Sequence, residues 1–167
     1  MRLIGVFSIA TLAALALQTT LPRILPFGML MPDLALILAV DLGLRHHRAA
    51  AALMAFGIGY ATDAFAGTRL GLNALIFVAI FILSYWLSRG FFSAGSGVGV
   101  TAVFAGVILC DYANYLASSG WSPDMTGLLL PTILIQAGIT ALFAPSVFAV
   151  MKSLCRWAVL RAQTSRG

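Results

Sequence analysis

The chain has 167 residues, of which 61% are hydrophobic and only 9% are charged, and its mean hydropathy is +1.01. Soluble globular domains carry about 25% charged residues. The composition therefore excludes a disordered segment, a disulfide-rich secreted scaffold and nearly all soluble enzymes. Ten basic residues against five acidic ones leave a net charge of +5. These proportions indicate an integral membrane protein with one basic side.

The spacing between charged residues predicts how the chain crosses the membrane. A helix needs about 20 apolar residues to span a hydrocarbon core of about 30 Å, and four charge-free stretches reach that length. Two further stretches contain aspartate, which is tolerated at a helix end or facing protein. The runs are continuously apolar and do not alternate, which excludes β-barrel strands. We expect one domain, an all-α bundle of six transmembrane helices at residues 3–22, 27–44, 49–66, 70–88, 97–118 and 127–151, with a basic tail at 152–167.

The first two segments each raise an alternative. Arg2 before the first apolar run resembles the start of a secretory signal peptide, but the run is longer than a signal core, so we expect a retained helix. The second segment carries Asp33 and Asp41, which are eight residues apart and cannot act as a catalytic pair on one helix. We expect Asp41 to form an ion pair with Arg45 on the same helix face. A functional role for Asp41 is the alternative.

The third segment ends near Asp63, shortly before the fourth begins. An ionisable side chain costs about 2.5 to 3.5 kcal/mol to insert at the bilayer centre, so Asp63 needs a partner. We expect it to meet Asp33 or Asn73 at the outer end of the bundle, with Arg69 or Arg23 as neutralising cations. Such a cluster would either bind something or fix the register of the helices. The sequence leaves both possibilities open.

The last two segments and the tail complete the chain. The glycine-rich stretch at 95–99 lacks the Lys-Ser/Thr pair of a phosphate-binding loop, so we expect a loop that opens the fifth segment. Pro131 and Pro145 are expected to kink the sixth. In the tail, apolar residues such as Trp157 separate the cations. This pattern predicts either a helix lying on anionic lipid or a frayed polar end.

The basic residues predict the orientation. With six spans and the amino terminus inside, eight of the ten Lys and Arg residues fall on the cytoplasmic side, and Arg23 and Arg69 fall outside. Both termini are therefore expected in the cytoplasm, by the positive-inside rule. Asp41 is expected nearer the cytoplasm. The other aspartates are expected near the outer face, namely Asp33, Asp63, Asp111 and Asp124.

No catalytic, cofactor or metal site is expected. His46 and His47 are adjacent, so on a helix they point about 100° apart and cannot chelate one ion together. Cys110 and Cys155 fall near opposite faces of the membrane and are expected to be free thiols. A membrane aspartyl protease uses two carboxylates that share a proton, but its Asn-x-Gly-Ala type of box is absent and six spans exceed its four. The topology explains the net charge, so no nucleic acid partner is expected.

Three short motifs follow one another in the middle of the chain. They are Met31-Pro32-Asp33-Leu34, then Gly59-Tyr60-Ala61-Thr62-Asp63 with Gly67 after it, then Leu70-Gly71-Leu72-Asn73-Ala74. Their order and spacing, together with the chain length and span count, resemble the rod shape-determining protein MreD family. Asp41 departs from that family, which is usually apolar or aromatic there. The residues that match the family pattern are Pro32, Asp33, Gly59, Asp63, Gly67, Gly71 and Asn73.

The resemblance implies a non-enzymatic subunit of the bacterial cell-elongation machinery in the inner membrane. Such a subunit would bind MreC, a single-span protein. Through MreC it would connect cytoplasmic MreB filaments with the glycosyltransferase RodA and a penicillin-binding transpeptidase. Recognition would rest on helix packing, which in lipid depends on small residues and polar contacts. The matching residues would either contact the partner or hold the bundle together.

A second interpretation is a substrate-binding subunit of an energy-coupling-factor vitamin transporter. Those subunits are six-helix bundles of similar size, and the MreD family resembles them remotely. Their pocket opens to the outside, and a ligand pocket needs several convergent polar and aromatic groups. The Ala-x-x-x-Ala coupling motif is not clearly placed in the first segment. Candidate pocket residues here are Asp33, Asp63, Asn73, Asp111, Tyr112, Asn114, Tyr115 and Trp121.

Overall fold

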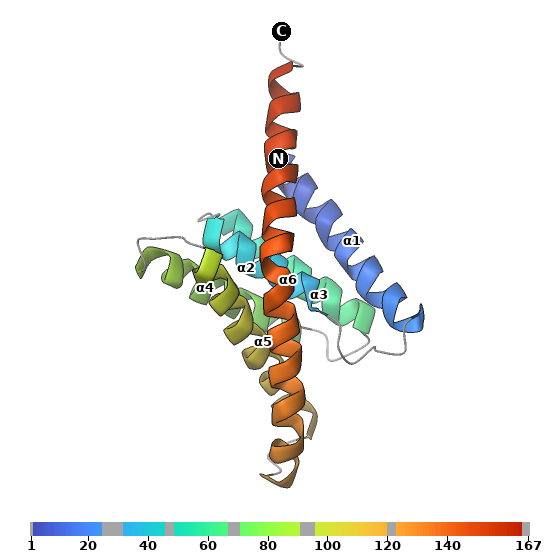
Figure 1. Cartoon of the computed structure of the whole chain (residues 1–167). Helices are drawn as coiled ribbons and strands as arrows, with labels where there is room; N and C mark the ends of the chain where they lie inside the picture. Colours follow the sequence, from blue (N-terminus) through green and yellow to red (C-terminus); the bar gives the residue numbers. More distant parts are fainter. Residues whose placement is uncertain are drawn as a thin grey trace.

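The computed structural model describes residues 2–24, 32–45, 49–66, 71–90, 96–119 and 123–164, and these residues form six α-helices (Figure 1). The predicted all-helical architecture is confirmed for this part of the chain. In chain order the helices are α1 (Arg2–Ile24), α2 (Leu34–Arg45), α3 (Ala49–Ala66), α4 (Leu72–Gly90), α5 (Ser96–Ser119) and α6 (Pro123–Thr164). Four stretches are long and apolar enough to cross a membrane, Ala49–Ala66, Leu72–Arg89, Gly97–Ala117 and Pro131–Trp157. These are the lengths expected of a multi-pass membrane protein.

The short helix α2 is the centre of the bundle. It contacts each of the other five helices, and all of its residues from Ala35 to Gly43 are buried. With 12 residues it is about 18 Å long, well short of the bilayer core. It begins at Leu34, later than the predicted start at residue 27, because Asp33 caps it there. Residues 27–31 lie outside the part that the structure describes.

The hydrophobic core is built around α2. Buried side chains of the surrounding helices form one cluster with those of α2, and α3 packs along α4 while α5 packs along α6. Because lipid is as apolar as the core, this packing depends on close van der Waals contact and on polar links between helices. The largest fully buried apolar side chains are Phe7, Leu36, Ile37, Val40, Leu42, Phe77, Ile80, Val103, Val107 and Met151.

The last helix is much longer than predicted. α6 is continuous over 42 residues, or about 63 Å, which is about twice the thickness of the bilayer core. It passes through Pro131 and Pro145 without ending. The tail, as far as Thr164, continues the same helix and extends beyond the rest of the bundle (red in Figure 1). The described tail is therefore part of α6 and not a helix separate from it.

Successive helices alternate in direction, so the end of one helix lies beside the start of the next. Charged side chains lie near these helix ends and therefore gather at the two ends of the bundle. Hydrogen bonds join the late part of α1 to the start of α2, and the end of α3 to the start of α4. We call this end the acidic end, and its described acids are Asp33, Asp63 and Asp111. We call the opposite end, reached by α2, α4 and α6, the basic end, and its described cations are Arg45, Arg89, Lys152 and Arg156. These acids and cations thus lie at opposite ends of the bundle, and their sides of the membrane stay a prediction.

Candidate functional site

Asp63, near the end of α3, caps a helix to which it does not belong. Its side chain is completely buried. Its carboxylate accepts hydrogen bonds from the backbone N–H groups of Gly71 at 2.8 Å, Asn73 at 3.1 Å and Ala74 at 3.4 Å. N–H groups in the first turn of a helix such as α4 have no partner within the helix. They also carry the positive end of the helix dipole, so a buried carboxylate and a helix start compensate each other.

Two glycines allow this capping arrangement. Gly71 has a φ of 96°, in the left-handed region that a side chain disfavours, and the chain turns there into α4. A Cβ atom at Gly59 would lie 2.6 Å from both the Cα of Ala74 and the carbonyl oxygen of Asn73. Gly59 therefore lets α3 approach the backbone of α4. Because residues four apart share a helix face, the Gly-x-x-x-Asp spacing puts this close contact and Asp63 on the same side of α3.

Asn73 extends the same arrangement to α5. Its Oδ1 accepts a hydrogen bond from Nδ2 of Asn114 at 2.8 Å and one from the thiol of Cys110 at 3.5 Å. The Asn114 amide also donates to the carbonyl oxygen of Cys110 at 3.0 Å. Asn73 and Cys110 are buried. Since a buried amide without partners is costly, this pairing favours one register of α4 against α5.

Asp33 caps the start of α2, as Asp63 caps the start of α4. Its Oδ1 accepts a hydrogen bond from the N–H of Leu36 at 3.0 Å, which is the usual geometry of an aspartate cap. The same oxygen accepts a bond from Nε2 of Gln18 at 3.1 Å, and Gln18 also donates to the carbonyl oxygen of Pro32 at 3.3 Å. The N–H of Asp33 donates to the hydroxyl of Thr140 at 3.3 Å. Pro32 and Asp33 therefore connect the start of α2 with α1 and α6.

These contacts form two groups at the acidic end, one around Asp33 and one around Asp63. The structure joins Asp63 to Asn73, the second of its two predicted partners. Gly67 and Arg69 lie outside the described residues, as does the side chain of Arg23. Among the side chains that the structure describes, no group of three His, Cys, Asp or Glu residues could hold a metal ion. We define the polar junction as Gln18, Pro32, Asp33, Gly59, Asp63, Gly71, Asn73, Cys110, Asn114 and Thr140.

Sequence reasoning did not select Gln18 and Thr140 as members of the junction. Gln18 begins the polar triplet Gln18-Thr19-Thr20 in α1, and Thr140 stands between apolar residues in α6. Thr140 is completely buried. An uncharged polar side chain in a span often bonds to a neighbouring helix, and that pattern is the signal that could have identified both.

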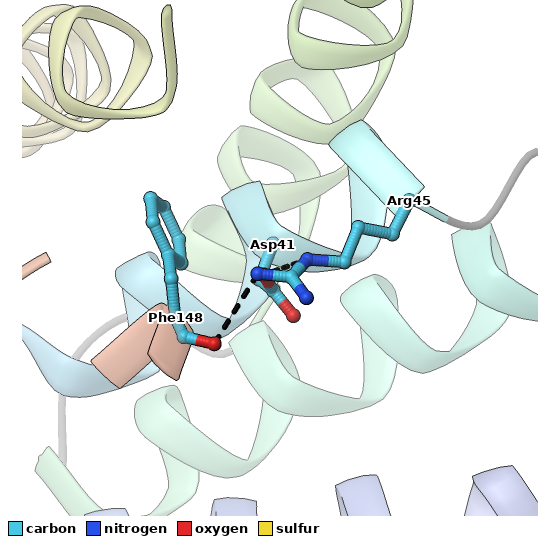
Figure 2. A network of polar contacts seen from close by, with 3 residues as sticks. All are labelled: Asp41, Arg45 and Phe148. Atoms are coloured by element: carbon cyan, nitrogen blue, oxygen red, sulfur yellow. Dashed lines mark hydrogen bonds and ion pairs between the residues drawn. The ribbon is translucent and has the colours of Figure 1, made fainter. Parts of the chain in front are cut away.

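Arg45 joins α2 to α6 at the basic end (Figure 2). Its Nε lies 2.6 Å from Oδ1 of Asp41, so the predicted ion pair is confirmed. Its Nη2 donates to the carbonyl oxygen of Phe148 at 3.2 Å, and the guanidinium carbon lies 6.0 Å from the centroid of the Phe148 ring. The Asp41 residue is only 1% exposed. Arg45 therefore compensates a buried charge that would otherwise be strongly destabilising.

A cavity of about 320 Å³ lies between α1 and α3, away from both polar clusters. It is lined by Phe7, Ser8, Thr11, Leu12, Met54, Gly57 and Ile58. None of these residues belongs to the polar junction or to the predicted vitamin pocket.

The two cysteines, Cys110 and Cys155, are free thiols, as predicted.

Comparisons with protein-family models, curated proteins and solved structures find no match to this chain. The functional interpretation therefore depends on the motifs and on the contacts described above.

Proposed function

We propose that this chain is a non-enzymatic scaffold subunit of the bacterial cell-elongation complex, similar to the MreD family. The observation that carries the proposal is the position of the residues that match the family pattern. Six of the seven are described, and all six belong to the polar junction, where they cap helices, permit close helix contact or link helices by hydrogen bonds. The residues that resemble the family thus hold α2 against α1 and α6, and α4 against α3 and α5.

A fixed bundle of this kind supports a scaffold function because it presents its outer helix surfaces in one geometry. Partner helices in lipid are recognised by close packing and by polar contacts, without a hydrophobic driving force. The proposed partner is an MreC-like single-span protein. Through it the chain would connect MreB filaments with RodA and a penicillin-binding transpeptidase, and so maintain the rod shape of the cell.

We place the chain in the bacterial inner membrane with the basic end in the cytoplasm. The support is the charge distribution, since cytoplasmic loops of membrane proteins carry the excess of Lys and Arg. Both termini would then be cytoplasmic, and the polar junction would lie toward the periplasm. In this orientation the carboxyl-terminal part of α6 would extend into the cytoplasm.

The vitamin-transporter alternative has weaker support from the contacts. Asp33, Asp63 and Asn73 bond to backbone and side-chain groups of neighbouring helices. A transporter pocket would need such groups to line a cavity, whereas the cavity between α1 and α3 is lined mainly by apolar side chains.

Co-isolation from the native membrane tests the proposal. The tagged chain, extracted in mild detergent, should retain a single-span protein with a periplasmic coiled coil, together with RodA and the transpeptidase in smaller amounts. A six-helix membrane protein carrying the same tag is the control. Retention of a small vitamin and of cytoplasmic ATPase subunits, without a single-span partner, would contradict the scaffold and favour the transporter.

A further inference from the structure

At the basic end, Arg45 of α2 contacts α6 about one turn before another cation, Lys152. The Arg45 guanidinium bonds to the carbonyl oxygen of Phe148, and this oxygen points along α6 toward the residue four positions later, which is Lys152. Lys152 also leaves α6 on the same face as Phe148. Arg45 and Lys152 therefore lie next to the same part of α6, and we use the name basic notch for Arg45, Phe148 and Lys152.

The positive charge of the basic notch is not balanced. Asp41 compensates Arg45, but Lys152 and Arg156 are exposed. Within the described part of the chain, no acidic side chain lies within ion-pair distance of Lys152 or Arg156. The notch therefore keeps an excess of positive charge where α6 leaves the bundle.

Arg45 retains hydrogen-bonding capacity that the helices do not use. A guanidinium has five N–H donors, and here one meets Asp41 and another meets the carbonyl oxygen of Phe148. The Arg45 side chain is 35% exposed, and no other acceptor for it is found among the described residues. Its orientation is already fixed by these two contacts (Figure 2). An anion bound to the remaining N–H groups would therefore not have to order the side chain.

The notch lies at the depth expected for lipid headgroups. The apolar stretch of α6 ends at Trp157, which is 55% exposed, and Trp86 near the same end of α4 is 73% exposed. Exposed tryptophans are enriched where the hydrocarbon meets the headgroups. Lys152 precedes Trp157 by little more than one turn of α6, so its ammonium group can reach this layer.

We propose that the basic notch binds the phosphate of an anionic phospholipid, held by Arg45 and Lys152. Basic pockets between transmembrane helices bind anionic headgroups in this way, and a fixed guanidinium matches two phosphate oxygens. The bound phosphate would compensate the charge of Lys152, which Asp41 does not balance. It would also link α2 to α6 at the point where α6 leaves the bundle. This proposal does not depend on the function proposed above.

The test compares lipid binding by the full chain and by charge variants. The purified protein in detergent is mixed with phosphatidylglycerol or with phosphatidylcholine, and retained lipids are counted by native mass spectrometry. Lys152→Gln removes a cation that makes none of the contacts between Asp41, Arg45 and Phe148. It should reduce the preference for phosphatidylglycerol about fivefold, while Lys152→Arg should keep it.

Arg89→Gln is the matched control, because Arg89 is an exposed cation at the same end whose guanidinium lies 5.3 Å from the Tyr85 ring. It lies on α4, which makes no contact with α6 in the described part of the chain, so its loss should leave the lipid preference unchanged. Equal losses in Arg89→Gln and Lys152→Gln would show a general basic surface and overturn the proposal. Absence of any preference in the original chain would also overturn it. So would equal binding of soluble glycerol phosphate, since the site would then belong to a free anion.

Discussion

Replacing Asp63 by Ala removes the carboxylate that caps α4 and leaves a small side chain in its place. The two shorter bonds that are lost join this carboxylate to the N–H groups of Gly71 at 2.8 Å and Asn73 at 3.1 Å. A bond to a charged acceptor contributes about 1.5 kcal/mol or more. We therefore expect Asp63→Ala to lower the free energy of unfolding by about 3 kcal/mol, which reduces the ratio of folded to unfolded protein about 150-fold.

The assay is unfolding in detergent micelles by increasing sodium dodecyl sulfate, followed by tryptophan fluorescence. Asp63→Asn should lose less stability, because its amide oxygen can still accept a hydrogen bond. The matched control is Thr62→Ala, since the Thr62 hydroxyl donates only within its own helix, to the carbonyl oxygen of Ile58 at 3.0 Å. Thr62→Ala should change stability by less than about 0.5 kcal/mol. If Asp63→Ala is no less stable than this control, the capping argument is refuted.

Three further predictions concern helix contact, the buried ion pair and topology. Gly59→Ala should lower the free energy of unfolding by about 1 to 3 kcal/mol, because the new Cβ would clash with the α4 backbone. Gly57→Ala is the control, since a Cβ there would have no heavy atom within 4 Å. It should leave the melting temperature in detergent nearly unchanged. Arg45→Ala should lower the free energy of unfolding by about 3 to 5 kcal/mol in the same detergent titration, because Asp41 stays buried without its partner. Replacing both Asp41 and Arg45 by Leu should recover most of this loss. If stability does not recover, the buried charge is not the cause. Single cysteines at Arg48 and Asp124 should react with an impermeant maleimide from the cytoplasmic and the periplasmic side respectively, and labelling of both from one side would refute the orientation.

The features that the sequence predicts correctly depend on local chemistry. Helix number and the separation of charges follow from the cost of placing charge in lipid, which acts on each segment separately. The ion pair of Asp41 with Arg45 follows from their spacing of four on one helix. The contact of Asp63 with Asn73 was one of two options, because the residues lie close in the chain on either side of a turn. The contacting residues in these cases are close in sequence, and the charge distribution follows from one rule, the exclusion of charge from lipid.

The features that were missed depend on contacts between distant segments. The short length of α2 follows from its position inside the bundle, where protein and not lipid surrounds it. Gln18 of α1 and Thr140 of α6 form hydrogen bonds with Asp33. No local sequence pattern predicts these contacts, because the three residues are far apart in the chain. The tail continues α6 because its sequence is compatible with a helix, whereas its cations next to Trp157 also suit a helix lying on lipid. Sequence spacing alone does not separate these two outcomes.

Depletion of the chain in a rod-shaped host, with cell width and length followed by microscopy, tests the scaffold proposal most directly. The proposal predicts that cells lose their rod shape and become round as the protein is diluted by growth. Re-expression of the original chain should restore the rods. Cells that stay rod-shaped after complete depletion would contradict the proposed role in cell elongation.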